Sequence, residues 1–167
     1  MPVPVVKLPD DAFRAQLREP LARIRTWGAS VAEVACIETS EGDRYWRLEA
    51  APAADHACPF ELIVHDDQRF DLLVGPETYE GCPIGDVHML LLLVEAIGDG
   101  RITTRSWVSR NTGAVRSVET LIALAGGGTW RGNRLNEPLS AAIQAEDCEA
   151  QDRCYVPYRI KGSPSAA

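Results

Sequence analysis

Apolar residues recur at helical spacing near the start of the chain. The steps between them are four, four and three, which places one apolar stripe on a helix formed by Phe13, Leu17, Leu21 and Ile24. Asp10 can cap this helix with its carboxylate, and Gly28 can end it. Pro20 falls inside the pattern and removes one backbone hydrogen bond, so we expect a kink or two short helices.

Strand-like segments follow in pairs, each pair separated by a turn sequence. Before the middle of the chain these segments are residues 31–39 with 44–50, and residues 60–65 with 70–74. Later in the chain, residues 101–110 and 114–124 flank Asn111-Thr112-Gly113, a sequence suited to the positive φ of a tight hairpin. Gly126-Gly127-Gly128 then turns the chain into a short strand around Trp130. A last helix is predicted to begin near Asn136, and an edge strand to run from Tyr155 to Ile160.

The segment from Val87 to Ile97 is apolar around most of its circumference if it is helical. Asp86 can cap this helix, and its polar residues His88 and Glu95 lie on one side. An ordinary surface helix has a single apolar stripe, so this helix must be covered on more than one side. Two arrangements remain open: burial between the sheet and the first helix of the same chain, or packing against a second copy of the chain in a two-fold homodimer.

These elements predict an α+β fold, with a mostly antiparallel sheet of hairpins and with helices packed on it. The length of 167 residues suits one domain, which we expect to span residues 1–161. Residues 162–167 have the composition of a disordered tail. We detect no internal repeat and recognise no family.

Charge is distributed unevenly along the chain. The net charge of −7 divides into −10 for residues 1–100 and +3 for residues 101–167. An acidic protein is poorly suited to binding nucleic acid, because that affinity depends on neutralising phosphates. The basic second part leaves room for a small acidic ligand.

Five cysteines and the absence of a signal-like start favour a cytoplasmic protein with reduced thiols. Cys36, inside a strand-like run, is predicted to be a small core residue. No apolar run reaches the length of roughly 20 residues that a membrane-spanning helix needs. We therefore expect no membrane association.

Arginine lies within two positions of every tryptophan in the sequence. Arg105 and Trp107 are two apart and should share one strand face, which Arg116 on the returning strand can reach. A guanidinium beside an indole can hold a carboxylate or phosphate, so these three residues are the predicted ligand-binding site. The plainer alternative is arginine stems packed across tryptophan on an exposed sheet.

Acidic residues after Gly75-Pro76 suggest a second, catalytic possibility. Glu77 and Glu80 lie close in sequence to His88, and a buried carboxyl group near histidine could perform acid–base chemistry. A solvated acidic loop is the simpler explanation. Histidines and cysteines lack the paired spacing of zinc ligands, and the glycine run lacks the Lys-Ser/Thr of a phosphate loop. We therefore expect no metal and no cofactor.

The sequence thus predicts a small non-enzymatic binding or protein-interaction module, expected to be homodimeric through the helix from Val87 to Ile97. A small enzyme that uses Glu77, Glu80 and His88 is the alternative. The identity of the ligand and the order of the strands are left open by the sequence.

Overall fold

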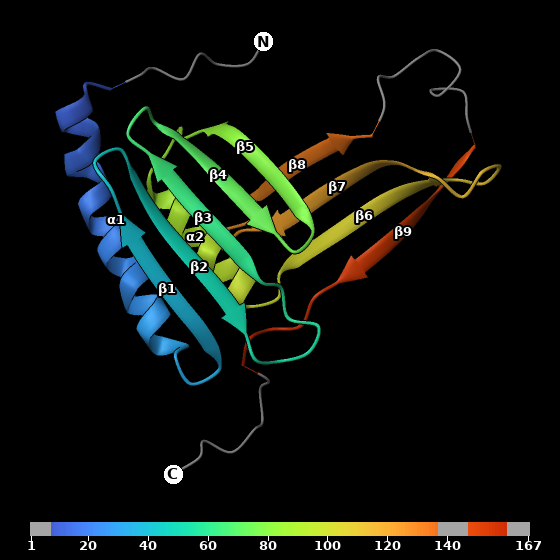
Figure 1. Ribbon diagram of the computed structural model, residues 1–167, viewed down its shortest axis with the longest axis horizontal. Helices are drawn as coiled ribbons and strands as arrows, with labels where there is room; N and C mark the ends of the chain where they lie inside the picture. The colour runs from blue at the N-terminus through green and yellow to red at the C-terminus, as the bar shows by residue number, and fades with distance from the viewer. Residues whose placement is uncertain (1–7, 137–146, 160–167) are drawn as a thin grey trace.

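Two antiparallel sheets and two helices make up the part of the chain that the structure describes. The computed structural model describes residues 8–136 and 147–159. The elements of the first half are α1 (Asp10–Ser30), β1 (Ala35–Glu41), β2 (Tyr45–Pro52), β3 (Phe60–His65), β4 (Arg69–Val74), β5 (Glu77–Pro83) and α2 (His88–Gly98). Those of the second half are β6 (Ile102–Ser109), β7 (Val115–Ala123), β8 (Thr129–Leu135) and β9 (Cys148–Cys154). The predicted α+β class is confirmed (Figure 1).

The first sheet is a meander with strand order β1-β2-β3-β4-β5. Alternation along each strand sends apolar side chains to one face, where Leu48, Leu62 and Leu72 stand opposite one another and are at most 1% exposed. Both helices contribute residues to the same core, including Phe13 of α1 and Leu93 of α2. The helices therefore cover the inner face of this sheet (Figure 1).

The strand β5 was not predicted, because its sequence is that of a polar loop. Its inward residues Glu77 and Tyr79 are buried, whereas Thr78 and Glu80 are exposed. Gly75 has a φ of 55° at the preceding turn, a conformation that favours glycine. The alternation of buried and exposed residues at the start of β5 depends on its pairing with β4, which the sequence alone does not reveal.

The helix α1 runs without interruption through Pro20, so the prediction of two short helices was wrong. Pro20 is itself buried in the apolar stripe, and this packing offsets the one hydrogen bond that proline removes. Asp10 does not cap the helix. The carbonyl of Pro9 accepts the N–H of Phe13 at 2.9 Å instead.

The helix α2 is buried within a single chain. Leu90, Leu93, Ala96 and Ile97 have no exposed surface, and α2 packs against α1 as well as against the sheets. A Cβ at Gly98 would lie 2.6 Å from the Trp27 ring of α1, so glycine permits this close approach. Burial between sheet and first helix, one of the two arrangements left open by the sequence, is the one observed.

The second sheet has the order β8-β7-β6-β9, and one end of it packs on the first sheet. The Tyr79 hydroxyl lies 2.6 Å from the Thr120 hydroxyl, and the Tyr79 and Trp130 rings meet edge to face with centroids 5.4 Å apart. A Cβ at Gly132 would lie 2.6 Å from the Tyr79 ring. The far end, with the β6–β7 turn, projects away from the helices (Figure 1).

A two-pronged ion pair also joins the two sheets. Arg134 of β8 donates from Nε and Nη2 to the Glu77 carboxylate at 2.6 and 2.9 Å. Glu77 is only 4% exposed, whereas about two fifths of the Arg134 side chain faces solvent. The buried Glu77 carboxylate therefore needs Arg134 to compensate its charge, whereas water can solvate Arg134.

The chain after β9 returns to the first half of the molecule. The Tyr158 hydroxyl donates to the Cys58 carbonyl at 2.6 Å, and the Tyr158 N–H donates to the Gly98 carbonyl at 2.8 Å. The edge strand predicted here is reduced to one bridge between Ala57 and Val156. The helix predicted near Asn136 and the tail at residues 162–167 lie outside the described residues.

In the described ranges, neither helix combines the length and the apolar character that crossing a membrane requires.

Arg134→Ala is expected to destabilise the protein more than Glu77→Gln. The first change leaves a buried carboxylate without its partner, at a cost of about 3 kcal/mol. The second leaves an arginine that water can solvate, at a cost of about 1 kcal/mol. Urea unfolding monitored by circular dichroism measures both. Arg131 lies on β8 like Arg134, so Arg131→Ala, which breaks its pair with Glu119 of β7, is the control and should cost at most about 0.5 kcal/mol. Equal losses for Arg134→Ala and Glu77→Gln would contradict this account.

Candidate functional site

An apolar row crosses the outer face of the second sheet. In the strand register, Trp107 of β6 stands opposite Ala150 of β9 on one side and Ser117 of β7 on the other, and Ser117 stands opposite Leu135 of β8. Residues directly opposite one another share a face. Trp107 is 38% exposed and Leu135 51% exposed. We call Trp107, Leu135 and Ala150 the apolar row.

The hairpin that carries Trp107 is held at its tip by a buried hydroxyl. The side chain of Ser109, 1% exposed, accepts the backbone N–H groups of Asn111 and Thr112 at 3.2 Å each. Gly113 has a φ of 72°, as the predicted turn requires. The turn therefore fixes the register that brings the apolar row together.

In the next row on this face, Arg105 stands between Asp152 and Glu119, and Arg131 reaches this row from the one beyond it. Arg105 donates from Nε and Nη2 to the two carboxylate oxygens of Asp152 at 2.7 and 2.9 Å. Arg131 reaches Glu119 at 3.0 Å. Hydrogen bonding from Arg105 lowers the pKa of Asp152, and hydrogen bonding to Asp152 raises the pKa of Arg105. The fork of Arg105 is therefore occupied by a side chain of the same molecule.

The predicted ligand residues assemble only in part. Arg105 and Trp107 share the outer face, as their spacing indicated. Arg116 falls at an irregularity between β6 and β7, and Ser117 rather than Arg116 stands opposite Trp107. Such bulges depend on the pairing of two strands and were not visible in the sequence.

The three acid–base candidates lie in different surroundings. Glu77 is held by Arg134 between the sheets, as described above. Glu80 lines an open hollow of about 470 Å³ on the far side of β5, and His88 begins α2. In the part of the chain that the structure describes, Glu77, Glu80 and His88 thus lie in three separate surroundings.

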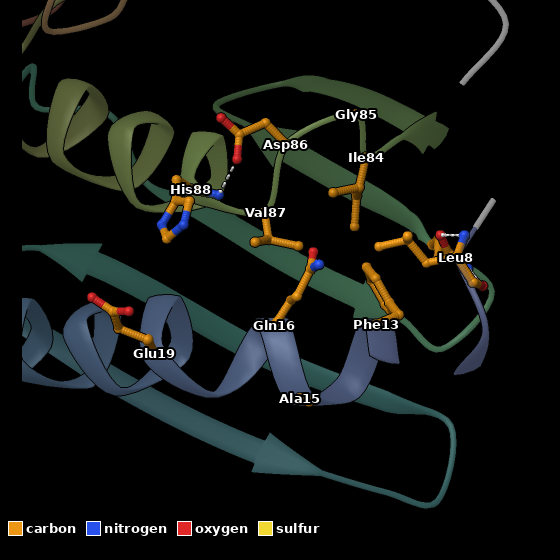
Figure 2. Close-up of a pocket in the computed structure, with 11 residues that line it drawn as sticks. Leu8, Phe13, Ala15, Gln16, Glu19, Ile84, Gly85, Asp86, Val87 and His88 are labelled. Carbon is orange, nitrogen blue, oxygen red and sulfur yellow. Dashed lines mark hydrogen bonds between the residues drawn. The ribbon is translucent and has the colours of Figure 1, made fainter. Parts of the chain in front are cut away.

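A groove of about 550 Å³ lies between α1 and the start of α2. Figure 2 shows Gln16 and Glu19 on α1 facing Val87 and His88 across this groove. Asp86 accepts the N–H of His88, the first residue of α2, at 2.9 Å, although Val87 rather than Asp86 occupies the N-cap position. The polar groups here serve the helix start and the solvent-facing rim, and they do not form a nucleophile–base pair.

Beside Glu80 lies a histidine, His65, that was not among the predicted site residues and that is held by a carboxylate. Nε2 of His65 lies 2.7 Å from Oδ2 of Asp71, and Oδ1 of Asp71 accepts the N–H of Gly81 at 2.7 Å. Register across the β3–β4 turn could have suggested this pair, but the irregular pairing of β4 with β5 could not be foreseen. Across residues 8–136 and 147–159, no group of three His, Cys, Asp or Glu side chains is placed to hold a metal ion.

The cysteines differ strongly in accessibility. Cys58 has no exposed surface, and burial raises the pKa of its thiol to about 12. Cys36 is exposed on the outer face of β1, so its predicted core position was wrong. Alternation along β1 turns Ala35 inward and Cys36 outward.

Comparison of the chain with known protein families, curated proteins and solved structures finds no match.

Arg105→Gln is expected to raise the pKa of Asp152 toward its usual value, because the hydrogen bonds from the guanidinium are lost. Carboxyl chemical shifts followed by NMR as a function of pH measure this change. Arg101 directly precedes β6 and pairs with Asp99, so Arg101→Gln should leave the titration of Asp152 unaltered. An unchanged Asp152 titration in Arg105→Gln would show that the ion pair does not form in solution.

Cys58 is expected to resist alkylation by iodoacetamide at pH 8 in the folded protein, whereas Cys36 reacts. Only a small fraction of a thiol with a pKa near 12 is ionised at that pH, and the side chain is enclosed. Peptide mass spectrometry measures the labelling of each cysteine. Labelling in urea provides the control, in which both should react. Equal labelling rates in the folded protein would contradict the burial of Cys58.

Proposed function

We propose that this protein is a non-enzymatic protein-interaction module that contacts its partner through the outer face of the second sheet. The exposed apolar row, with Trp107 at its centre, carries this proposal. Tryptophan is enriched among the residues that dominate binding energy at protein interfaces. Here it lies on a sheet that extends from the core rather than in the core itself (Figure 1).

The charges beside the apolar row favour a protein partner over a small acidic ligand. Arg105 and Arg131 are paired with Asp152 and Glu119, so an anion would have to compete with existing carboxylates. Polar groups beside an apolar centre are typical of protein–protein interfaces. We therefore infer that the partner presents apolar side chains and little net charge.

A cytoplasmic location belongs to the same proposal. All five cysteines are free, including the exposed Cys36 and Cys154. Free exposed thiols suit a reducing compartment.

Self-association also remains part of the proposal, but the helix α2 gives it little support. Its leucines are hidden within one protomer, and only Met89, Leu92 and Glu95 are half-buried while His88 is exposed. A second copy is therefore not needed to cover this helix.

Trp107→Ala is expected to weaken partner binding at least about tenfold, because it removes the largest apolar contact of the row. Tagged protein is used to isolate partners from extract of the source cells, and each candidate partner is then purified and titrated by calorimetry. Binding of a purified partner to the wild-type protein, together with a weaker Kd for Trp107→Ala, supports the proposal.

Tyr45→Ala is the matched control for this experiment. Tyr45 is a similarly exposed aromatic residue, 43% exposed, but it lies on the first sheet. It should leave the Kd unchanged. The proposal fails if no purified candidate binds, or if Trp107→Ala binds as tightly as the wild-type protein.

A further inference from the structure

The strand β9 ends the second sheet with an open edge. In the described part of the chain it pairs with β6 alone, and six of its seven residues are exposed. Charged side chains can protect an edge strand, and β9 carries Glu149, Asp152 and Arg153, but it contains no proline, lysine or bulge. Such an edge can accept another strand.

The direction of the backbone groups defines which residues would make those hydrogen bonds. The Asp147 carbonyl points toward β6, where it accepts the Arg110 N–H at 3.0 Å. Backbone groups alternate in direction along an antiparallel strand. The N–H and C=O groups of the outer-face residues therefore point to the open edge, namely those of Cys148, Ala150, Asp152 and Cys154.

The sequence of β9 is self-complementary about its central residue. It reads Cys-Glu-Ala-Gln-Asp-Arg-Cys, from Cys148 to Cys154. If two copies pair antiparallel about a two-fold axis at Gln151, Glu149 of each copy stands opposite Arg153 of the other. Gln151 then stands opposite itself, and Cys148 opposite Cys154. Opposite charges at such cross-strand positions stabilise strand pairing.

Other registers are less complementary. A two-fold axis perpendicular to the sheet keeps every residue on its own face, so one residue must stand opposite its own copy. A change of register therefore moves the axis by one whole residue. An axis at Asp152 would place this carboxylate opposite its own copy. An axis at Ala150 would place Asp147, which precedes β9, opposite Arg153, but it would place Glu149 opposite Gln151 and leave Cys154 beyond the paired segment of β9.

We propose that two copies of this protein associate through β9 in the register centred on Gln151. The association joins two four-stranded sheets into one sheet of eight strands. Because the axis is perpendicular to the sheet, the Trp107 residues of both copies lie on the same face. This inference goes beyond the proposed partner binding and does not depend on it, since the edge of β9 and the apolar row are different surfaces.

A charge exchange tests the register. Glu149→Arg or Arg153→Glu alone places like charges opposite each other twice across the axis, and each change is expected to raise the dimer dissociation constant roughly tenfold or more. The double variant Glu149→Arg/Arg153→Glu restores opposite charges and should regain dimerisation. Sedimentation equilibrium over a concentration series measures the constants, and circular dichroism verifies folding.

Two control variants separate this edge from other causes. Arg110→Gln removes the contact of Glu149 with Arg110 at 3.9 Å without changing the edge, so dimerisation should persist. Leu92→Gln alters the half-buried face of α2 and should also leave dimerisation intact. Loss of the dimer in Leu92→Gln, with none in Glu149→Arg, would assign the association to the helix and overturn the proposal.

A disulfide across the axis gives an independent result. Gln151→Cys, in a background with Cys36, Cys148 and Cys154 changed to serine, should form a covalent dimer under mild oxidation, because only this register places residue 151 opposite itself. Ala150→Cys in the same background should not. A wild-type protein that stays monomeric at all concentrations, a failed charge exchange, or crosslinking of Ala150→Cys in place of Gln151→Cys would each overturn the proposal.

Discussion

The burial of α2 on more than one side is the constraint on which the rest of the structure depends. A fully buried leucine stabilises the fold by about 2 kcal/mol, and α2 contributes Leu90 and Leu93 with no exposed surface. One sheet cannot cover such a helix. The helix α1 covers another side, at a distance so short that Gly98 must face Trp27 without a side chain, and β7 also packs against α2.

The second sheet meets the first through a mixture of apolar and polar contacts, and this mixture explains its shape. Tyr79 inserts against Gly132 and Trp130, while Arg134 reaches the buried Glu77. These contacts involve β7 and β8, so the opposite edge, β9, is left in solvent on both faces. The two surfaces proposed above for binding, the outer face of the second sheet and the edge of β9, therefore lie away from α2.

Short-range patterns predicted most elements correctly. The residues of β3 matched their alternation, and the β6–β7 hairpin formed around Asn111-Thr112-Gly113. The strand β5 was not predicted because its sequence is polar. Its residue Glu77 is buried only because Arg134, more than fifty positions away, pairs with it. Of the candidate ligand residues, Arg105 and Trp107 share a face as predicted. Arg116 lies at a bulge and does not stand opposite Trp107.

The sequence by itself determined the class of the fold, the places of its turns and the need to cover the helix α2, because these follow from hydrophobic periodicity and from the φ preferences of glycine and asparagine. Only the tertiary structure decided what covers α2, which charges are already paired, and which strand has an open edge. Those outcomes depend on contacts between residues distant in the chain, such as Arg105 with Asp152, and no local pattern records such contacts.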